Sequence, residues 1–334
     1  MTPTSYRARS ISPSRAATDQ RMLPDFLSVV LRALSFVLQL QAAGAVFFTA
    51  AFGPALTISL TGIRKLARVT AIAALVAVAG HYVLEAARMA GEMSGMFDTS
   101  LQTLSWTSTL GGAFTVRVLG LLLIIAAMRA VPVRVTASRL SASSVGSPLT
   151  AVLKRLSARG FTLVGVSGAV LVAASFTLTG HTSTSGWRAL LAPLLLAHLL
   201  IVSFWFGALW PLCLVTLRES WERMARVVAV FSVAAFWLVP LILVAGVAMA
   251  VLLLPDVAAV RQPYGELLLA KVGLFAVLLG CGAFNKWRLG PALARGELQA
   301  GRRFRRVVVV EYVLMVVVLS VTAVLTTFFS PESP

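Results

Sequence analysis

Side chains that can bind a metal ion gather in one short stretch, residues 80–98, which reads GHYVLEAARMAGEMSGMFD. The candidate ligands in it are His81, Glu85, Met89, Met93 and Met96. They are three or four residues apart, so a continuous helix would present all of them along one face. Thioether sulfur is a soft ligand that selects Cu(I), and imidazole also suits copper. The stretch predicts a copper site, while ordinary packing in an apolar helix is the alternative interpretation of the methionines.

The segments that must position these residues are long and apolar. Of the 334 residues, 58% are hydrophobic and 12% are charged, which excludes an ordinary soluble globular domain. A helix needs about 20 apolar residues to cross the hydrocarbon of a membrane, and lipid offers no partner for unpaired backbone groups. We predict an all-α polytopic membrane protein, a bundle of eight transmembrane helices. The predicted spans are 26–50, 66–89, 112–130, 160–180, 189–214, 227–254, 267–287 and 307–328.

Basic residues alternate between the connections. Clusters of Lys and Arg follow the first, third, fifth and seventh spans, whereas the other connections carry one cation each, Arg88, Arg188 and Arg261. The positive-inside rule places the basic connections in the cytoplasm and both termini in the periplasm. The net charge of +17 is therefore a topology signal, and we expect no nucleic-acid partner.

The first 25 residues are rich in Ser, Arg and Pro, and they predict a disordered N-terminal tail, 1–25. The arginines of this tail conflict with a periplasmic position. Two explanations fit: the later basic connections outweigh the tail, or translation begins at Met22.

A basic cytoplasmic linker, 131–159, divides the transmembrane domain 26–330 into two halves. One half comprises 26–130 plus 160–180, and the other comprises 189–328. Four spans in each half would give both halves the same orientation, which suggests a 4+4 parallel repeat.

Charged groups inside the predicted spans need partners, because an ionisable group at membrane depth costs a few kcal/mol. Arg32, Arg117 and Lys271 each lie about one and a half turns in from the outer face. A supporting polar network, in which Glu85 pairs with one of these cations, is the structural alternative to a metal site. Glu311 lies alone, toward the cytoplasmic end of the eighth span.

All three histidines of the chain lie at or inside span boundaries. His181 ends the fourth span at the outer surface, and His198 lies near the middle of the fifth. We predict that both join His81 as metal ligands, with a hydrogen-bonded core position as the alternative for each one. The sequence lacks a phosphate-binding loop, a Cys-x-x-Cys motif and a serine nucleophile elbow, so we do not expect an enzyme.

Several segments resemble one known family. They are LRALSFVLQLQAAGAVFF (31–48), TLGGAFTVR (109–117), TGHTS (179–183), HLLIVSFWFGALWPL (198–212), YGELLLAK (264–271), AFNKWRLGPAL (283–293) and VEYVLMVVVLSVTAVLT (310–326). Over about residues 26–330 the sequence resembles the copper-resistance D (CopD) family of bacterial inner-membrane proteins. Phe114 departs from the tryptophan that the family pattern leads us to expect.

The resemblance implies an eight-helix protein that moves copper across the bacterial inner membrane. It implies His181 and His198 as site residues, and Lys271 and Asn285 as structural or gating groups. It also implies a separate periplasmic copper-binding protein, of the copper-resistance C type, as a partner.

Our leading hypothesis is a copper permease that imports the ion from periplasm to cytoplasm, with copper and membrane lipid as its partners. One alternative is a haem-binding electron-transfer protein in which His81 and His198 hold the iron. Another is an assembly or sensing factor that binds copper without transporting it.

Overall fold

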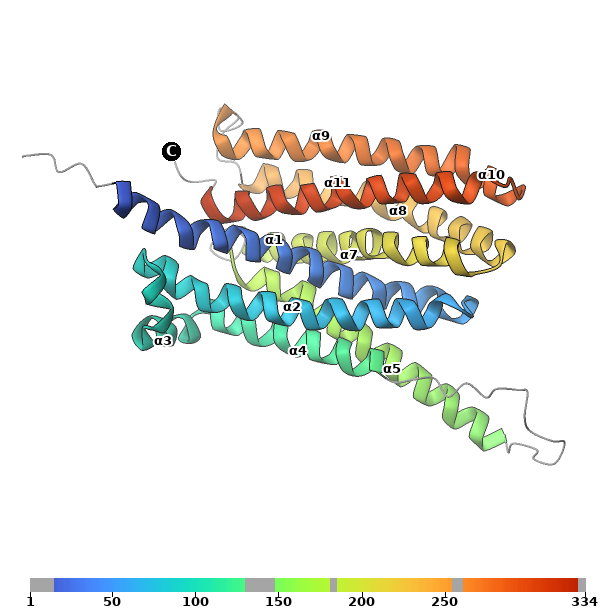
Figure 1. The fold of residues 1–334 in the computed structure, drawn as a ribbon, viewed down its shortest axis with the longest axis horizontal. Helices are drawn as coiled ribbons and strands as arrows, with labels where there is room; N and C mark the ends of the chain where they lie inside the picture. Colours follow the sequence, from blue (N-terminus) through green and yellow to red (C-terminus); the bar gives the residue numbers. More distant parts are fainter. Residues whose placement is uncertain (1–14, 130–147, 181–184, 254–260, 330–334) are drawn as a thin grey trace, which may run out of the picture.

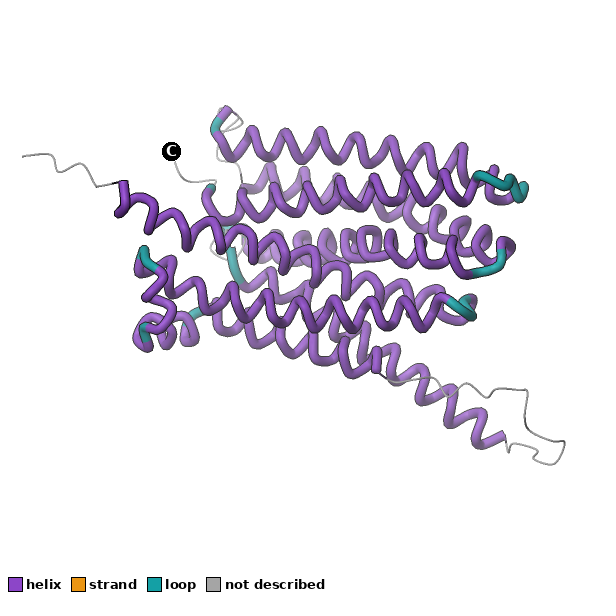
Figure 2. The backbone as a smooth tube through the Cα atoms, viewed as in Figure 1, coloured by secondary structure: helices purple, strands orange, loops and turns teal. Residues whose placement is uncertain are grey.

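The computed structural model describes residues 15–129, 148–180, 185–253 and 261–329, and within these ranges the chain is helical and contains no strand (Figures 1 and 2). The long helices lie side by side along one direction (Figure 1). The α-helices are α1 (Arg15–Phe52), α2 (Ser59–Ala90), α3 (Thr99–Thr107), α4 (Thr109–Arg129), α5 (Pro148–Ser175), α7 (Arg188–Arg218), α8 (Trp221–Leu253), α9 (Pro263–Phe284), α10 (Gly290–Ala294) and α11 (Ala300–Phe328). Short 3₁₀ turns are η1 (Gly53–Ala55), η2 (Met93–Phe97) and η3 (Phe176–Leu178), and η5 (Asn285–Leu289) is a π-helical turn between α9 and α10.

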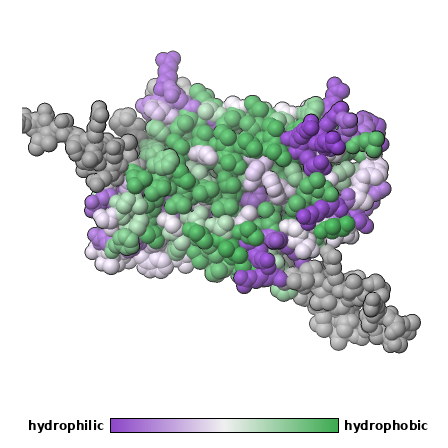
Figure 3. All heavy atoms as spheres, viewed as in Figure 1, coloured by the Kyte–Doolittle hydropathy of each residue, from purple (hydrophilic) through white to green (hydrophobic). Residues whose placement is uncertain are grey.

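The predicted bundle of eight transmembrane helices is confirmed. Eight segments of the described chain are long and apolar enough to cross a membrane. They are Leu23–Ala55, Ser59–Ala90, Thr109–Arg129, Gly160–Leu178, Arg188–Arg218, Trp221–Leu253, Pro263–Ala294 and Ala300–Phe328. In the view of Figure 3, apolar surface covers the middle of the molecule and hydrophilic residues gather at the two ends. This distribution fits a protein whose middle band faces lipid.

The helices extend beyond the predicted spans. Helix α1 begins at Arg15, within the range 1–25 for which we predicted a disordered tail, and residues 1–14 lie outside the described part of the chain. Helix α5 begins at Pro148, so the last part of the predicted linker 131–159 is helical, while 131–147 lie outside the described residues. Hydropathy marks only the part of a helix that lipid surrounds, whereas backbone hydrogen bonding continues into polar turns beyond it.

Glycine lets two pairs of helices approach closely. A methyl group built on Gly44 of α1 would overlap the backbone of Ser203 and Gly207 on α7, and one built on Gly120 of α4 would overlap the backbone of Gly168 on α5. Small residues at such crossings let helix backbones pack directly against each other, which is a common way for membrane helices to associate. The first crossing brings α1 against α7, and the second brings α4 against α5.

The two ends of the bundle differ in character. We call the end that holds α3, the last turns of α2 and α11, and the outer part of α1 the network end (Figure 1). We call the opposite end, which holds η1, the α7–α8 connection and α10, the basic end. Its cations include Arg64, Lys65, Arg68, Arg218, Arg223, Arg226, Arg295, Arg302, Arg303, Arg305 and Arg306. Helix α1 enters the bundle and α11 leaves it at the same, network end (Figure 1).

Glu219, in the connection between α7 and α8 at the basic end, binds the start of α2. Its Oε1 accepts hydrogen bonds from the backbone N–H groups of Thr57, Ile58 and Ser59 at 3.0, 2.8 and 2.8 Å, and Ser59 Oγ donates to it at 2.7 Å. Desolvation alone would raise the pKa of the Glu219 carboxyl, but these hydrogen bonds outweigh it and lower the pKa to about 2. The carboxylate therefore caps the start of α2 with a full negative charge.

Candidate functional site

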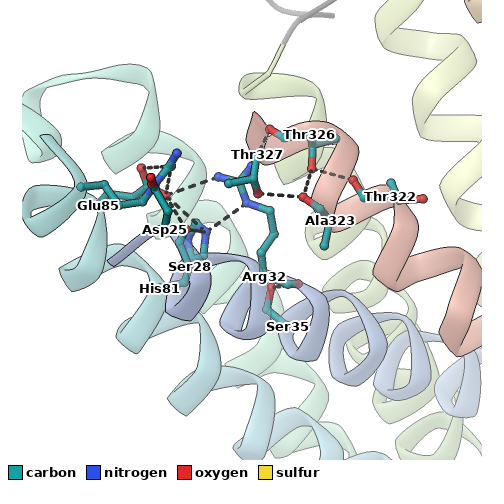
Figure 4. A network of polar contacts seen from close by, with 11 residues as sticks. Asp25, Ser28, Arg32, Ser35, His81, Glu85, Thr322, Ala323, Thr326 and Thr327 are labelled. Atoms are coloured by element: carbon teal, nitrogen blue, oxygen red, sulfur yellow. Dashed lines mark hydrogen bonds and ion pairs between the residues drawn. The ribbon is translucent and has the colours of Figure 1, made fainter. Parts of the chain in front are cut away.

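His81 and Glu85 lie one turn apart near the network end of α2. The distance between His81 Nε2 and Glu85 Oε1 is 3.3 Å, and both side chains are largely buried. The prediction that their spacing places them on one face of a helix is confirmed. Figure 4 shows both side chains directed toward α1.

Arg32 joins three helices at this point (Figure 4). Its Nε donates a hydrogen bond to His81 Nε2 at 3.1 Å, and its Nη2 donates to Glu85 Oε1 at 3.3 Å. Its Nη1 donates to the backbone carbonyl of Thr326 on α11 at 2.7 Å. The guanidinium group thus ties α1 to α2 and α11, and Glu85 pairs with one of the predicted cations.

A second guanidinium group completes the cluster, which we call the network (Asp25, Ser28, Arg32, His81, Glu85 and Arg88). Arg88 Nη1 contacts Glu85 Oε2 at 3.0 Å, and Arg88 Nε donates to Asp25 Oδ1 at 3.0 Å. Two arginines face two carboxylates, so the charges of the network balance. The contribution of Arg88 was not predicted from the sequence, although its spacing of three residues from Glu85 indicates the pair.

Arg32 occupies His81 Nε2, a ring nitrogen that could bind a metal ion. Because the Arg32 Nε–H donates to His81 Nε2, that nitrogen acts as an acceptor and the imidazole is neutral with its proton on Nδ1. A metal ion at Nε2 has to displace Arg32. Arg32 is therefore a built-in cation at the place where we predicted a copper ion.

Arg117 lies close to the network without joining it. Its Nε donates a hydrogen bond to Ser175 Oγ at 3.0 Å, and its guanidinium group lies 4.5 Å from the ring centroid of Phe176. Its charge acts on His81. Arg117 thus adds positive charge beside the network while the end of α5 and η3 hold its side chain.

The helix that carries His81 and Glu85 stops before the last two methionines. Helix α2 ends at Ala90, and Gly91 follows with a φ of 74°, which reverses the chain. Met93 and Met96 lie in the turn η2, so the expectation of a single helical face through all five candidates is wrong. Met89 is half exposed, and Asp98 caps α3 by accepting a hydrogen bond from Ser100 N–H at 2.8 Å.

His198 has different surroundings from His81. Its Nδ1 lies 3.2 Å from the backbone oxygen of Ile242 on α8, and the charge of Lys271 acts on it. In the described part of the chain, no hydrogen bond or ion pair joins His81 to His198, the pair that the haem alternative requires. No three His, Cys, Asp or Glu side chains there form a group able to hold a metal ion. His181 lies outside the described residues.

Asn285 and Glu311 form a separate pair in the half of the bundle nearest the basic end. Asn285 Nδ2 donates a hydrogen bond to Glu311 Oε1 at 2.6 Å, and both residues are buried. Asn285 is therefore in contact with a buried carboxyl group, and the expectation that Glu311 stands alone is wrong. The sequence placed both residues in spans but gave no sign that they meet across two helices.

Comparison with known proteins agrees with the resemblance seen in the sequence. The family model described as CopD, Copper resistance protein D, matches residues 225–325, which cover α9, η5, α10 and nearly all of α8 and α11. A "Copper resistance protein D" of Pseudomonas syringae pv. tomato is 33% identical over 148 residues, which are 40% of this chain. The match spans 47%, about half, of the length of that relative. No solved structure matches the chain.

Proposed function

We propose that this chain, whose residues 225–325 match the copper resistance protein D family model, carries copper across the bacterial inner membrane. The direction that we propose is from periplasm to cytoplasm. The family supports copper as the ion, and the eight membrane-spanning helices support a route through the bilayer.

The proposed sidedness follows from charge. The basic end, with its clusters of Lys and Arg, faces the cytoplasm by the positive-inside rule. The network end then faces the periplasm, and a separate periplasmic copper-binding protein would deliver the ion there.

The observation that carries the proposal is the contact of His81 with Glu85, closed by Arg32. Imidazole and carboxylate are both copper ligands, and here a positively charged group already contacts both of them. We infer that copper displaces Arg32, whose Nη1 keeps an anchor on the Thr326 carbonyl of α11. Cu(I) carries the same charge as the guanidinium group that it would displace from His81 and Glu85.

The remaining candidates are assigned by position and chemistry. Met89, Met93 and Met96, with His181, would capture copper at the outer surface, because thioether and imidazole suit Cu(I). His198 would receive the ion deeper in the bundle, beside Lys271. Copper binding requires neutral imidazole, so protonation of a histidine would favour release.

Copper uptake into vesicles that contain the purified protein tests the proposal. Replacement of His81, His181 and His198 together should abolish uptake, and Glu85→Gln should reduce it several-fold. Glu92→Gln is the matched control, since Glu92 is an exposed glutamate at the same end of the bundle and should leave uptake unchanged.

Three results would overturn the proposal. Uptake that is unchanged in the triple histidine variant excludes the route. Copper binding without any uptake by the wild-type protein favours an assembly or sensing factor, and a visible Soret band that disappears with His81→Ala or His198→Ala favours a haem protein.

A further inference from the structure

The pair of Asn285 and Glu311 has features that the copper route does not use. Glu311 on α11 is 3% exposed, and Asn285 at the start of η5 is 7% exposed. Their hydrogen bond, from Asn285 Nδ2 to Glu311 Oε1, measures 2.6 Å. None of the ion pairs found among the described residues includes Glu311.

An ionised carboxylate is poorly accommodated at such a place. Burial removes the water that stabilises the charge, and a single neutral amide does not replace it. Buried carboxylates are normally paired with a cation or exist in the neutral, protonated form. The surroundings of Glu311 therefore favour the carboxylic acid.

The amide of Asn285 supplies a second reason to expect a protonated Glu311. Asn285 Oδ1 is buried and accepts no hydrogen bond in the described part of the chain. Buried polar atoms are rarely left without a partner, and a carboxylic acid has an O–H donor that a carboxylate lacks. If the amide is turned the other way, the 2.6 Å contact joins two oxygens and again requires a proton between them.

We propose that Glu311 and Asn285 form a proton-binding site, in which Glu311 carries the proton in the conformation described here. Acid and amide then complement each other, with the amide N–H donating to the carboxyl oxygen and the acid O–H donating to the amide oxygen. This inference goes beyond copper transport and stands without it.

The groups around the site leave it without a countercharge. Cys213 on α7 and Cys281 on α9 lie near Glu311, and a thiol supplies no positive charge. Arg305, on the same helix as Glu311, donates to a backbone carbonyl of α7 at 3.5 Å. Lys286 of η5 lies over an aromatic ring of α8, 3.4 Å from its centroid. Helix α10 has no titratable side chain. On α1, Asp25 and Arg32 form their ion pairs in the network, at the other end of the bundle from the basic end.

The backbone at Asn285 suits a site that changes with protonation. Residues Asn285–Leu289 form a π-helical turn, and Pro291 follows in the first turn of α10. Such turns interrupt the regular hydrogen bonding of a helix and are frequent at functional sites. Loss of the proton would leave a bare carboxylate, which stays in place only if water or a cation reaches it.

Infrared spectroscopy of the full chain in lipid vesicles at neutral pH tests the proposal. The difference between wild type and Glu311→Gln should contain the C=O stretch of a protonated carboxylic acid and no carboxylate bands. Glu311→Gln keeps an amide that can pair with Asn285, so the variant should fold. Glu266→Gln is the matched control, because Glu266 is an exposed glutamate at the start of α9 and should lose carboxylate bands.

A second measurement needs no variant. Dicyclohexylcarbodiimide, an apolar reagent that reacts with protonated carboxyl groups, should label Glu311 of the wild-type protein at neutral pH, as read by mass spectrometry of its peptide. The label should decline as the pH rises. Carboxylate bands for Glu311 in the infrared difference, or labelling that is absent at every pH, would overturn the proposal.

Discussion

Glu85 and Glu311 both lie in membrane-spanning helices, and their surroundings differ in kind. Glu85 contacts two guanidinium groups, with 15% of its side chain exposed. Glu311 is almost fully buried and has one amide as its hydrogen-bond partner among the described residues. The same side chain is thus stabilised as an anion at the network end and favoured as a neutral acid nearer the basic end.

This difference in partners bears on which ion could be exchanged at Glu85 and which at Glu311. At the network end, Arg32 holds the place of a cation beside His81 and Glu85, which is the place that we propose for copper. Around Glu311 no such cation is in place, and the smallest exchange that changes its charge is the loss of a proton. A membrane protein can thus use one residue type for two kinds of ion, according to the partners that its helices supply.

Glu85→Gln should have the largest effect on folding. The change leaves Arg32 and Arg88 facing each other in a partly buried cluster, and uncompensated charges of this kind cost about 3 kcal/mol. The free energy of unfolding in detergent, from denaturant titration, measures the loss. Glu92→Gln serves as the control, and equal stability of both variants would show that the network does not depend on ionised Glu85.

Glu219→Gln should lower the free energy of unfolding by about 2 kcal/mol, because a charged acceptor of several hydrogen bonds is lost. The pKa of Glu219 is lowered from 4.5 to about 2, so its contribution is fully present above pH 4.5. It declines as the pH falls through this interval toward 2. The wild-type protein should therefore lose stability over that range more steeply than the variant, and parallel pH profiles would contradict the charged cap.

The sequence was sufficient to predict the fold class and part of the network. Hydropathy located eight spans because lipid imposes one requirement, helical and apolar, on every crossing segment. The helical repeat placed His81 beside Glu85, since that contact lies within a single helix.

Contacts between helices were not predictable in the same way. The pairing of Asn285 with Glu311 depends on how α9 and α11 pack, and the choice of Arg32 over Lys271 as a partner of Glu85 depends on how α1 meets α2. The turn at Gly91 was also missed, although a glycine after an apolar helix is a common stop signal. The metal ligands remain predictions for the uptake experiment.

Glu311→Gln should change the free energy of unfolding by less than about 1 kcal/mol, in contrast to Glu85→Gln. An amide replaces a neutral acid of nearly the same shape, and both can form two hydrogen bonds with Asn285. Denaturant titration of both variants under one condition makes the comparison direct. A loss as large as that of Glu85→Gln would indicate that Glu311 is ionised in the folded protein.

Gln39→Leu should give the smallest effect, with the opposite sign. Ser28, Arg32, Ser35 and Gln39 are four, three and four residues apart, so they form a polar stripe on one face of α1 that leads from the network into the bundle. Gln39 is fully buried, and neither atom of its amide has a hydrogen-bond partner among the described residues. Removing an unsatisfied amide should raise the free energy of unfolding by about 0.5 kcal/mol.

Copper uptake by Gln39→Leu tests whether the polar stripe on α1 is part of the ion route. If the stripe carries ions from the network toward the centre of the bundle, Gln39→Leu should reduce copper uptake while the protein becomes slightly more stable. Ser320→Ala on α11 is a suitable control, because the Ser320 hydroxyl donates to the backbone oxygen of Val316 at 2.9 Å within its own helix. A stable variant with wild-type uptake would restrict the ion route to residues off this face of α1, and a destabilised one would show that Gln39 finds a partner in the folded protein.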